Sequence, residues 1–207
     1  MSPNLGRLQS LVQEPAARAF FKGLFSRAHL ELTDTGERFT IRQDGDNVSV
    51  VEGFDSPDAN LVVPLASQNV ANLGTIFADR QVSGDEAYRI VRFMVRPCLE
   101  AALKMPILQH DRLLSILRVD DTWQQALLDP QGQEDVKFTV HKVDGKWSVA
   151  EGYHGSPRRR LCLTAEQMLD FQRRLFKADE DNSITAWLGL AGWYVTWRDQ
   201  LTVPVAP

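Results

Sequence analysis

The clearest pattern in the sequence is a stretch of alternating apolar and polar residues that occurs twice. Phe39–Phe54 reads FTIRQDGDNVSVVEGF and Phe138–Tyr153 reads FTVHKVDGKWSVAEGY, and the two align without a gap. The following pairs preserve both identities and apolar character: Phe39-Thr40 with Phe138-Thr139, Ile41 with Val140, Ser49-Val50 with Ser148-Val149, Glu52-Gly53 with Glu151-Gly152, and Phe54 with Tyr153. Alternation on either side of an Asp-Gly pair (Asp44-Gly45 in the first copy) predicts a β-hairpin with one buried face in each copy.

The similarity extends beyond the hairpin. The further pairs are Ser56-Pro57 with Ser156-Pro157, Leu61 with Leu161, Ala66 with Ala165, Gln68 with Gln167, Ile76-Phe77 with Leu175-Phe176, and Phe93-Met94-Val95 with Trp193-Tyr194-Val195. Solenoid repeats have periods of roughly 20 to 50 residues, and the period here is much longer. We therefore predict duplication of a whole domain, with repeats at residues 1–105 and 106–207 and a boundary near Met105-Pro106.

Further strands are expected on both sides of each hairpin. Residues 29–32 and 123–128 precede the two hairpins and have strand-like composition. A third apolar run, Leu61–Val63 or Leu161–Leu163, follows a Ser-Pro turn. Each repeat should therefore contain a small, mostly antiparallel sheet.

Amphipathic helices surround these strands in the sequence. Thr164 and Gln167 have the spacing of a capping box, and an apolar stripe at helical period follows them. Ser83 and Glu86 predict a second such start, for a helix that Pro97 restarts or kinks. The other expected helical segments are Val70–Phe77, Ile184–Leu201, Ala17–Phe25 and Leu108–Leu117. The predicted fold class is α+β, with two tandem repeats of a small sheet covered by amphipathic helices.

Composition narrows the functional classes. The 43% hydrophobic content is enough for packed cores, and the net charge of -4 comes from interspersed signs, which disfavours a nucleic-acid surface. Cys98 and Cys162 lie in apolar stretches without CxxC spacing, so they fit buried residues in a reducing cytoplasm. Neither a signal peptide nor a long apolar membrane span is expected.

No motif in the sequence names a reaction. The four histidines, His29, His110, His141 and His154, show no spacing typical of metal ligands, and GxSxG, Walker and GxGxxG motifs are absent. We therefore predict no metal, no cofactor and no enzymatic activity. The repeated Glu52 and Glu151 are interpreted as parts of conserved turns, with paired catalytic carboxylates as the alternative. Arg158-Arg159-Arg160 is interpreted as a solvated turn, with binding of a phosphate or lipid headgroup as the alternative.

The order of elements resembles the sterol carrier protein type 2 family, the SCP-like lipid-binding domain. The segments that carry the resemblance are Asp58-Ala59-Asn60-Leu61-Val62-Val63, the amphipathic helix after it, and Gln81-Val82-Ser83-Gly84-Asp85 before the last helix. It covers residues 39–94 and, through the duplication, residues 138–197. The resemblance implies a sheet and helices that enclose an apolar tunnel for a sterol, a fatty acyl chain or a similar lipid.

If the resemblance holds, the helix faces should line one pocket in each repeat. The expected residues are Phe20, Phe21, Leu24, Phe77, Phe93 and Met94 in the first and Phe171, Phe176, Trp187, Trp193, Tyr194 and Trp197 in the second. Stripes of this kind also fill ordinary cores, and the aromatic crowding after Ile184 is equally compatible with an interface between the copies.

Three functional hypotheses follow. The first is a non-catalytic carrier of an apolar small molecule or lipid, without stable membrane insertion. The second is a protein-interaction, scaffold or enzyme-accessory module with filled cores and a protein partner or homo-oligomer. It predicts no ligand-sized cavity in either half and one exposed apolar patch on a helix pair. The third is an enzyme with Glu52 and Glu151 in a cleft between the copies.

Overall fold

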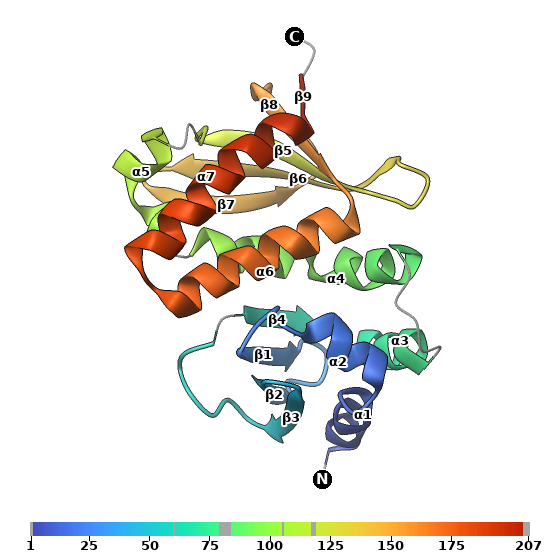
Figure 1. Cartoon of the computed structure of the whole chain (residues 1–207). Helices are drawn as coiled ribbons and strands as arrows, with labels where there is room; N and C mark the ends of the chain where they lie inside the picture. Colours follow the sequence, from blue (N-terminus) through green and yellow to red (C-terminus); the bar gives the residue numbers. More distant parts are fainter. Residues whose placement is uncertain (1, 60, 79–83, 105, 117–118, 205–207) are drawn as a thin grey trace. The chain divides into compact units, whose positions relative to one another are not determined.

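The computed structural model describes residues 2–59, 61–78, 84–104, 106–116 and 119–204 (Figure 1). It confirms the predicted α+β class, because helices accompany two mixed sheets. The chain divides into two compact units, Met1–Cys98 and Leu99–Pro207, and the division falls inside helix α4 (Gly84–Leu103).

The first unit contains a four-stranded sheet in the order β3-β2-β1-β4. Strand β1 runs parallel to β4, and the other pairs are antiparallel. The elements are α1 (Pro3–Leu11), α2 (Pro15–Phe21), β1 (Arg27–Leu32), β2 (Arg38–Asp44), β3 (Asn47–Glu52), β4 (Leu61–Leu65), α3 (Ser67–Ala78) and the first part of α4.

The second unit contains a five-stranded sheet in the order β7-β6-β5-β8-β9. Strand β5 runs parallel to β8, and β9 adds an antiparallel strand at the far edge. After the end of α4 come η1 (Pro106–Gln109), α5 (Asp111–Ile116), β5 (Thr122–Leu128), β6 (Glu134–Val143), β7 (Lys146–Glu151), β8 (Arg159–Leu163), α6 (Ala165–Asp181), α7 (Ile184–Leu201) and β9 (Thr202–Pro204).

The first four strands of each sheet share one topology and one register. Phe39 pairs with Glu52 in β3, and Phe138 pairs with Glu151 in β7, as the aligned hairpins require. The register also corrects one pair of the sequence alignment: Val63, not Leu61, lies at the position of Leu161. The loop that precedes β4 in the first unit and β8 in the second differs in length between the copies. The sequence alignment placed this length difference at the wrong position.

Both hairpins close through two-residue turns with positive φ. In the second unit Asp144 and Gly145 have φ of 51° and 75°, as a type I′ turn requires. In the first unit the turn is Gly45-Asp46 and not the predicted Asp44-Gly45, since Asp44 still pairs with Asn47. Only Gly45 has a positive φ there, which fits a type II′ turn.

Capping residues mark the ends of helices α6 and α1. Thr164 and Gln167 form the predicted capping box of α6, and Asn182 ends this helix in the left-handed conformation. Helix α4 continues through Pro97, so the predicted restart does not occur. The predicted cap residue Ser83 lies outside the described residues. Helix α1, which the sequence pattern did not predict, begins at Ser2, whose hydroxyl accepts from the backbone N–H groups of Asn4 and Leu5.

Candidate functional site

Most of the residues expected to line the first pocket are packed in the core of the first unit. Phe20, Phe21, Leu24 and Met94 are all buried, and the rings of Phe20 and Phe21 meet edge to face at 5.5 Å. Phe93 on α4 is 37% exposed. The side chain of Phe77 lies outside the described residues.

The residues expected to line the second pocket form an aromatic layer between α6 and α7. The ring of Phe171 lies 5.3 Å from that of Trp197, 5.9 Å from Tyr194 and 6.2 Å from Trp193. Trp193 and Trp197 are stacked at 5.0 Å. These rings are half-buried, as is Trp187, whereas Phe176 is fully buried. The structure thus brings four of the six residues into direct mutual contact.

The repeated Glu-Gly pair belongs to a turn that is built the same way in both units. Glu52 and Glu151 end their strands with exposed side chains, and the glycine after each has positive φ. The buried hydroxyl of Thr139 donates to the carbonyl of Gly152 at 2.9 Å and accepts from the backbone N–H of His154 at 2.9 Å.

Thr40 forms the same two bonds in the first unit, with Gly53 and Asp55, at 2.8 and 3.2 Å. This explains the repeated Phe-Thr and Glu-Gly pairs by turn structure. The sequence contained the signal, because both pairs are identical in the two copies, but it did not reveal that they bond to each other.

Close in sequence and space to each of these turns, polar side chains of the sheet form a cluster. In the second unit Glu134 accepts from the hydroxyl of Tyr153 at 2.9 Å and forms an ion pair with Arg160 at 3.4 Å. Cys162 donates to the same carboxylate at 3.5 Å. Burial and this hydrogen bond raise the pKa of Cys162 to about 11, so the thiol is protonated at neutral pH.

The matching cluster of the first unit is centred on Asp55. Its carboxylate lies 3.5 Å from Arg27 and 3.9 Å from His29, and it also pairs with Arg42. Burial opposes ionisation of Asp55, but Arg42 and Arg27 hold its pKa below the usual range. Burial, as the main cause, lowers the pKa of His29. Both clusters therefore pair a carboxylate with arginine.

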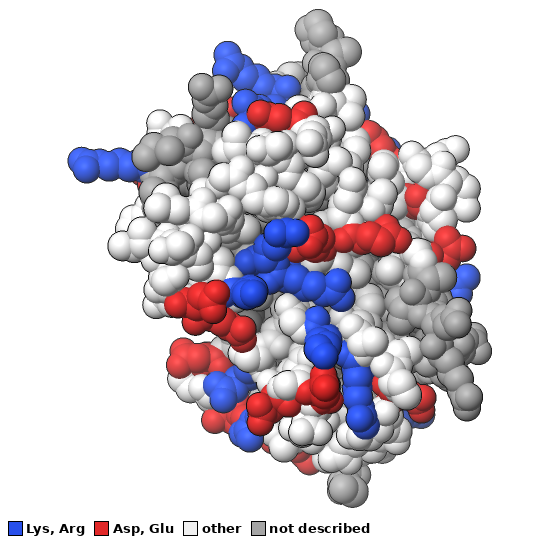
Figure 2. All heavy atoms as spheres, in the orientation of Figure 1, with Lys and Arg blue, Asp and Glu red and all other residues white. Residues whose placement is uncertain are grey.

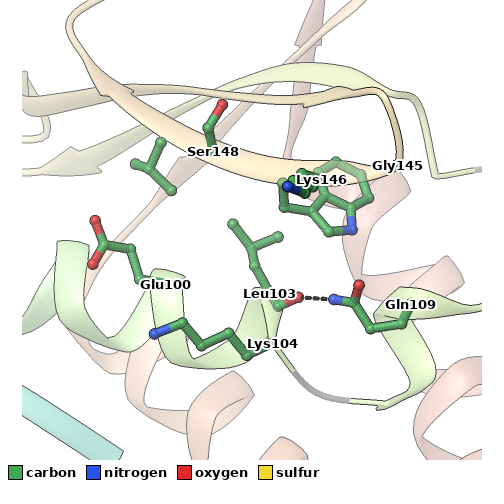
Figure 3. A pocket seen from close by; sticks show the side chains of 9 residues that line it. Glu100, Leu103, Lys104, Gln109, Gly145, Lys146 and Ser148 are labelled. Atoms are coloured by element: carbon green, nitrogen blue, oxygen red, sulfur yellow. Dashed lines mark hydrogen bonds between the residues drawn. The ribbon is translucent and has the colours of Figure 1, made fainter.

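A hollow in the second unit lies beside the edge strand β7. It has a volume of about 500 Å³. Figure 3 shows β7 and the β6–β7 turn on one side of it, and the end of α4 with η1 on the other. The lining residues are Glu100, Leu103, Lys104, Gln109 and the segment Gly145, Lys146, Trp147, Ser148 and Val149. Sequence patterns gave no indication of this hollow, because it depends on where the α4 end meets the sheet edge.

The backbone of β7 presents alternate residues to this hollow. In an antiparallel pair closed by a two-residue turn, the residues flanking the turn are hydrogen bonded to each other, and every second pair after them repeats this. Lys146, Ser148 and Ala150 are consequently bonded to β6. The N–H and C=O groups of Trp147 and Val149 point to the free edge.

The first unit covers the same edge with helix α1. The side-chain amide of Gln9 donates to the carbonyl of Val50 at 3.3 Å, and that of Gln13 donates to the carbonyl of Val48 at 3.4 Å. Val48 and Val50 are the counterparts of Trp147 and Val149 in the aligned hairpins. In the second unit Gln109, which precedes α5 as Gln13 precedes α2, donates instead to the carbonyl of Leu103 (Figure 3).

No group of three or more His, Cys, Asp or Glu side chains in the described part of the chain is placed to hold a metal ion. Within the same residues, no helix combines the length and apolar character needed to cross a membrane.

Comparisons with known proteins do not place the chain in a family. No family model, no curated protein and no solved structure matches it.

Proposed function

We propose that the chain is a non-catalytic protein-interaction module whose second unit binds an extended peptide segment of a partner along β7. The observation that carries the proposal is the contrast between two equivalent strand edges. In the first unit, glutamine side chains from α1 take the outward carbonyls of β3. In the second unit, the equivalent edge borders a hollow of about 500 Å³.

The backbone chemistry of β7 suits an added strand. Trp147 and Val149 each offer one N–H donor and one C=O acceptor, which is the pattern that an extended peptide satisfies in β-augmentation. Each such bond contributes about 0.5–1.5 kcal/mol net, so the backbone alone gives weak binding. Side chains of the peptide must supply the remaining binding free energy.

The walls of the hollow indicate which peptide it would take. Leu103, Trp147 and Val149 provide apolar surface, while Glu100, Lys104 and Lys146 provide charges of both signs. The indole N–H of Trp147 donates to the carbonyl of Leu108 at 2.8 Å, which fixes this ring in the wall. We therefore expect a segment with an apolar anchor residue flanked by charged residues.

The proposal is tested with a phage-displayed library of random twelve-residue peptides and synthetic copies of the enriched sequences. The Val149→Pro variant removes one outward N–H and adds bulk at the edge, and it leaves the β6–β7 bonds intact. Val149→Ala is the matched control, since it loses side-chain packing but keeps the N–H. We expect proline to weaken peptide binding at least tenfold and alanine to change it less than threefold.

Hydrogen exchange gives an independent readout. Bound peptide should slow exchange of the Trp147 and Val149 amides and leave the Ser148 amide, already bonded to β6, unchanged. If no peptide is enriched, or if Val149→Pro binds enriched peptides as tightly as the parent chain, the proposal is wrong.

A second candidate function is binding of an apolar ligand at the aromatic layer between α6 and α7, as the SCP-like resemblance implies. The observation that favours it is a hollow of about 220 Å³ beside Trp193, where Leu190, Ala186 and Ala178 give apolar surface and Arg174, Lys177 and Asp181 give charged groups that could hold a ligand head group. Oleic acid titrated into a Trp123→Phe/Trp147→Phe variant should change the emission of the remaining tryptophans, all of which lie on α7. Unchanged emission, together with no bound fatty acid in native mass spectra, would contradict this function.

A further inference from the structure

Helix α7 is unusual because it is apolar on all sides and yet faces solvent. No charged residue occurs between Ile184 and Trp197. Ile184 is 80% exposed and Leu188 is 66% exposed, and Arg198 is the one residue of α7 that is fully buried. Figure 2 shows that the surface over α7 is largely without charged side chains, whereas acidic and basic groups gather along α6. Helices that are apolar all round are normally covered.

The duplication provides an internal comparison for this helix. Helix α4 is the counterpart of α7, with Phe93-Met94-Val95 aligned to Trp193-Tyr194-Val195. Apart from the first residues of the two helices, Gly84 and Ile184, four aligned positions are exposed in both helices. They are occupied by Asp85, Arg89, Arg92 and Arg96 in α4 and by Thr185, Gly189, Gly192 and Thr196 in α7. The charged outer face of the first copy is thus replaced by small, uncharged residues in the second.

The spacing of these four residues is the same in both directions along the helix. Steps of four, three and four residues separate Thr185, Gly189, Gly192 and Thr196. Two copies of α7 packed antiparallel about a two-fold axis would therefore place glycine level with glycine and threonine level with threonine. Glycine allows helices to approach closely, and a Cβ atom placed on Gly189 or Gly192 would meet no atom within 4 Å.

From this face we propose that α7 is a self-association surface, and that two copies of the chain pair through antiparallel α7 helices. An interface related by a two-fold axis must be complementary to itself, and an uncharged face with symmetric spacing meets this condition. Beside the face, a hollow of about 220 Å³ is lined by Thr185, Gly189 and Trp193 of α7, and it offers room for a side chain of the second copy. Its α6 wall includes the charged residues Arg174, Lys177 and Asp181. In the antiparallel register, Leu188 of one copy lies level with Trp193 of the other. The inference is independent of peptide binding at β7, because it uses a different element.

The first experiment is sedimentation velocity of the full chain from 1 to 200 µM. The test variant is Gly189→Arg/Gly192→Arg, which places on α7 the residues that α4 has at the same positions. The matched control is Gly6→Arg, because Gly6 is also exposed in a helix and also has open space around it. We expect the parent chain and Gly6→Arg to dimerise equally and the double variant to associate at least tenfold more weakly. Its circular dichroism and unfolding midpoint should show that it remains folded.

Salt distinguishes the proposed contact from one made by charged surfaces. Because the α7 face is uncharged, dimerisation should persist in 0.5 M NaCl, whereas association through exposed ion pairs weakens. The interpretation is wrong if the parent chain stays monomeric up to 200 µM, or if the double variant or Gly6→Arg gives the opposite of its expected result. A monomeric chain that co-sediments with phosphatidylcholine vesicles would assign this face to lipid instead.

Cysteine crosslinking tests the orientation. With both native cysteines replaced by serine, Thr185→Cys mixed with Thr196→Cys should form a disulfide-linked dimer upon oxidation. Thr185→Cys alone should not, since two copies of this position lie about 16 Å apart along antiparallel helices with a rise of 1.5 Å per residue. Crosslinking of Thr185→Cys to itself would contradict the antiparallel arrangement.

Discussion

The hydrogen bonds of the Thr139 turn allow a quantitative prediction of the free energy of unfolding. Thr139 is 1% exposed, and its hydroxyl satisfies the carbonyl of Gly152 and the N–H of His154. Thr139→Val keeps the shape and the β propensity of the residue but leaves both backbone groups without this partner. An unsatisfied buried group costs about 1–3 kcal/mol, and water reaches part of this turn, so we expect the free energy of unfolding to fall by about 1–2 kcal/mol.

The tryptophans provide a selective assay for this change. All five lie in the second unit, so tryptophan emission during urea unfolding reports on that unit. With a urea dependence of about 1–3 kcal/mol per M, the midpoint should fall by roughly 0.5–1 M. Thr122→Val on β5 is the control, because Thr122 is only half-buried and its hydroxyl takes no part in the turn. If both variants lower the midpoint equally, the turn bonds do not stabilise the unit as argued.

Three further predictions follow from other residues. Because burial lowers the pKa of His29 below its ordinary value of 6.5, the first unit should lose stability as pH falls below about 6.5, and His29→Gln should remove this part of the pH dependence in urea unfolding followed by circular dichroism. Cys162, with a pKa of about 11, should react with Ellman's reagent at pH 7.5 at least tenfold more slowly than free cysteine, and a rate equal to that of cysteine would refute its placement beside Glu134. Asn182 has φ of 40°, so Asn182→Gly should leave the melting temperature unchanged or raise it, whereas Asn182→Ala should lower the free energy of unfolding by about 1 kcal/mol.

The strands and most helices could be predicted because their signals are local. The hairpins of β2–β3 and β6–β7 follow from alternation and turn residues, and the start of α6 follows from the spacing of Thr164 and Gln167. Helix α1 was missed because its residues carry only a weak apolar stripe and its cap is the second residue of the chain. Strand β9 was missed because three residues give no periodicity.

Long-range features could not be predicted in the same way. The parallel pairing of β1 with β4 joins segments that are far apart in sequence, and no local pattern encodes it. The polar clusters around Asp55 and Glu134 also assemble residues from several strands and loops. The aromatic residues of α6 and α7 were identified from the sequence, but only the coordinates show that Phe171 stacks with Trp193 and Trp197.

The packing of α1 beside β3 affects what happens when further copies of the unit are added to the chain. In the second unit, the segment beside the equivalent strand β7 is the end of α4, and α4 is also the last helix of the first copy. Head-to-tail fusion therefore leaves the second copy without a helix of its own in the position of α1. A longer tandem array built by the same rule would gain one uncovered strand edge with every copy, and with it one more position for partners or for aggregation.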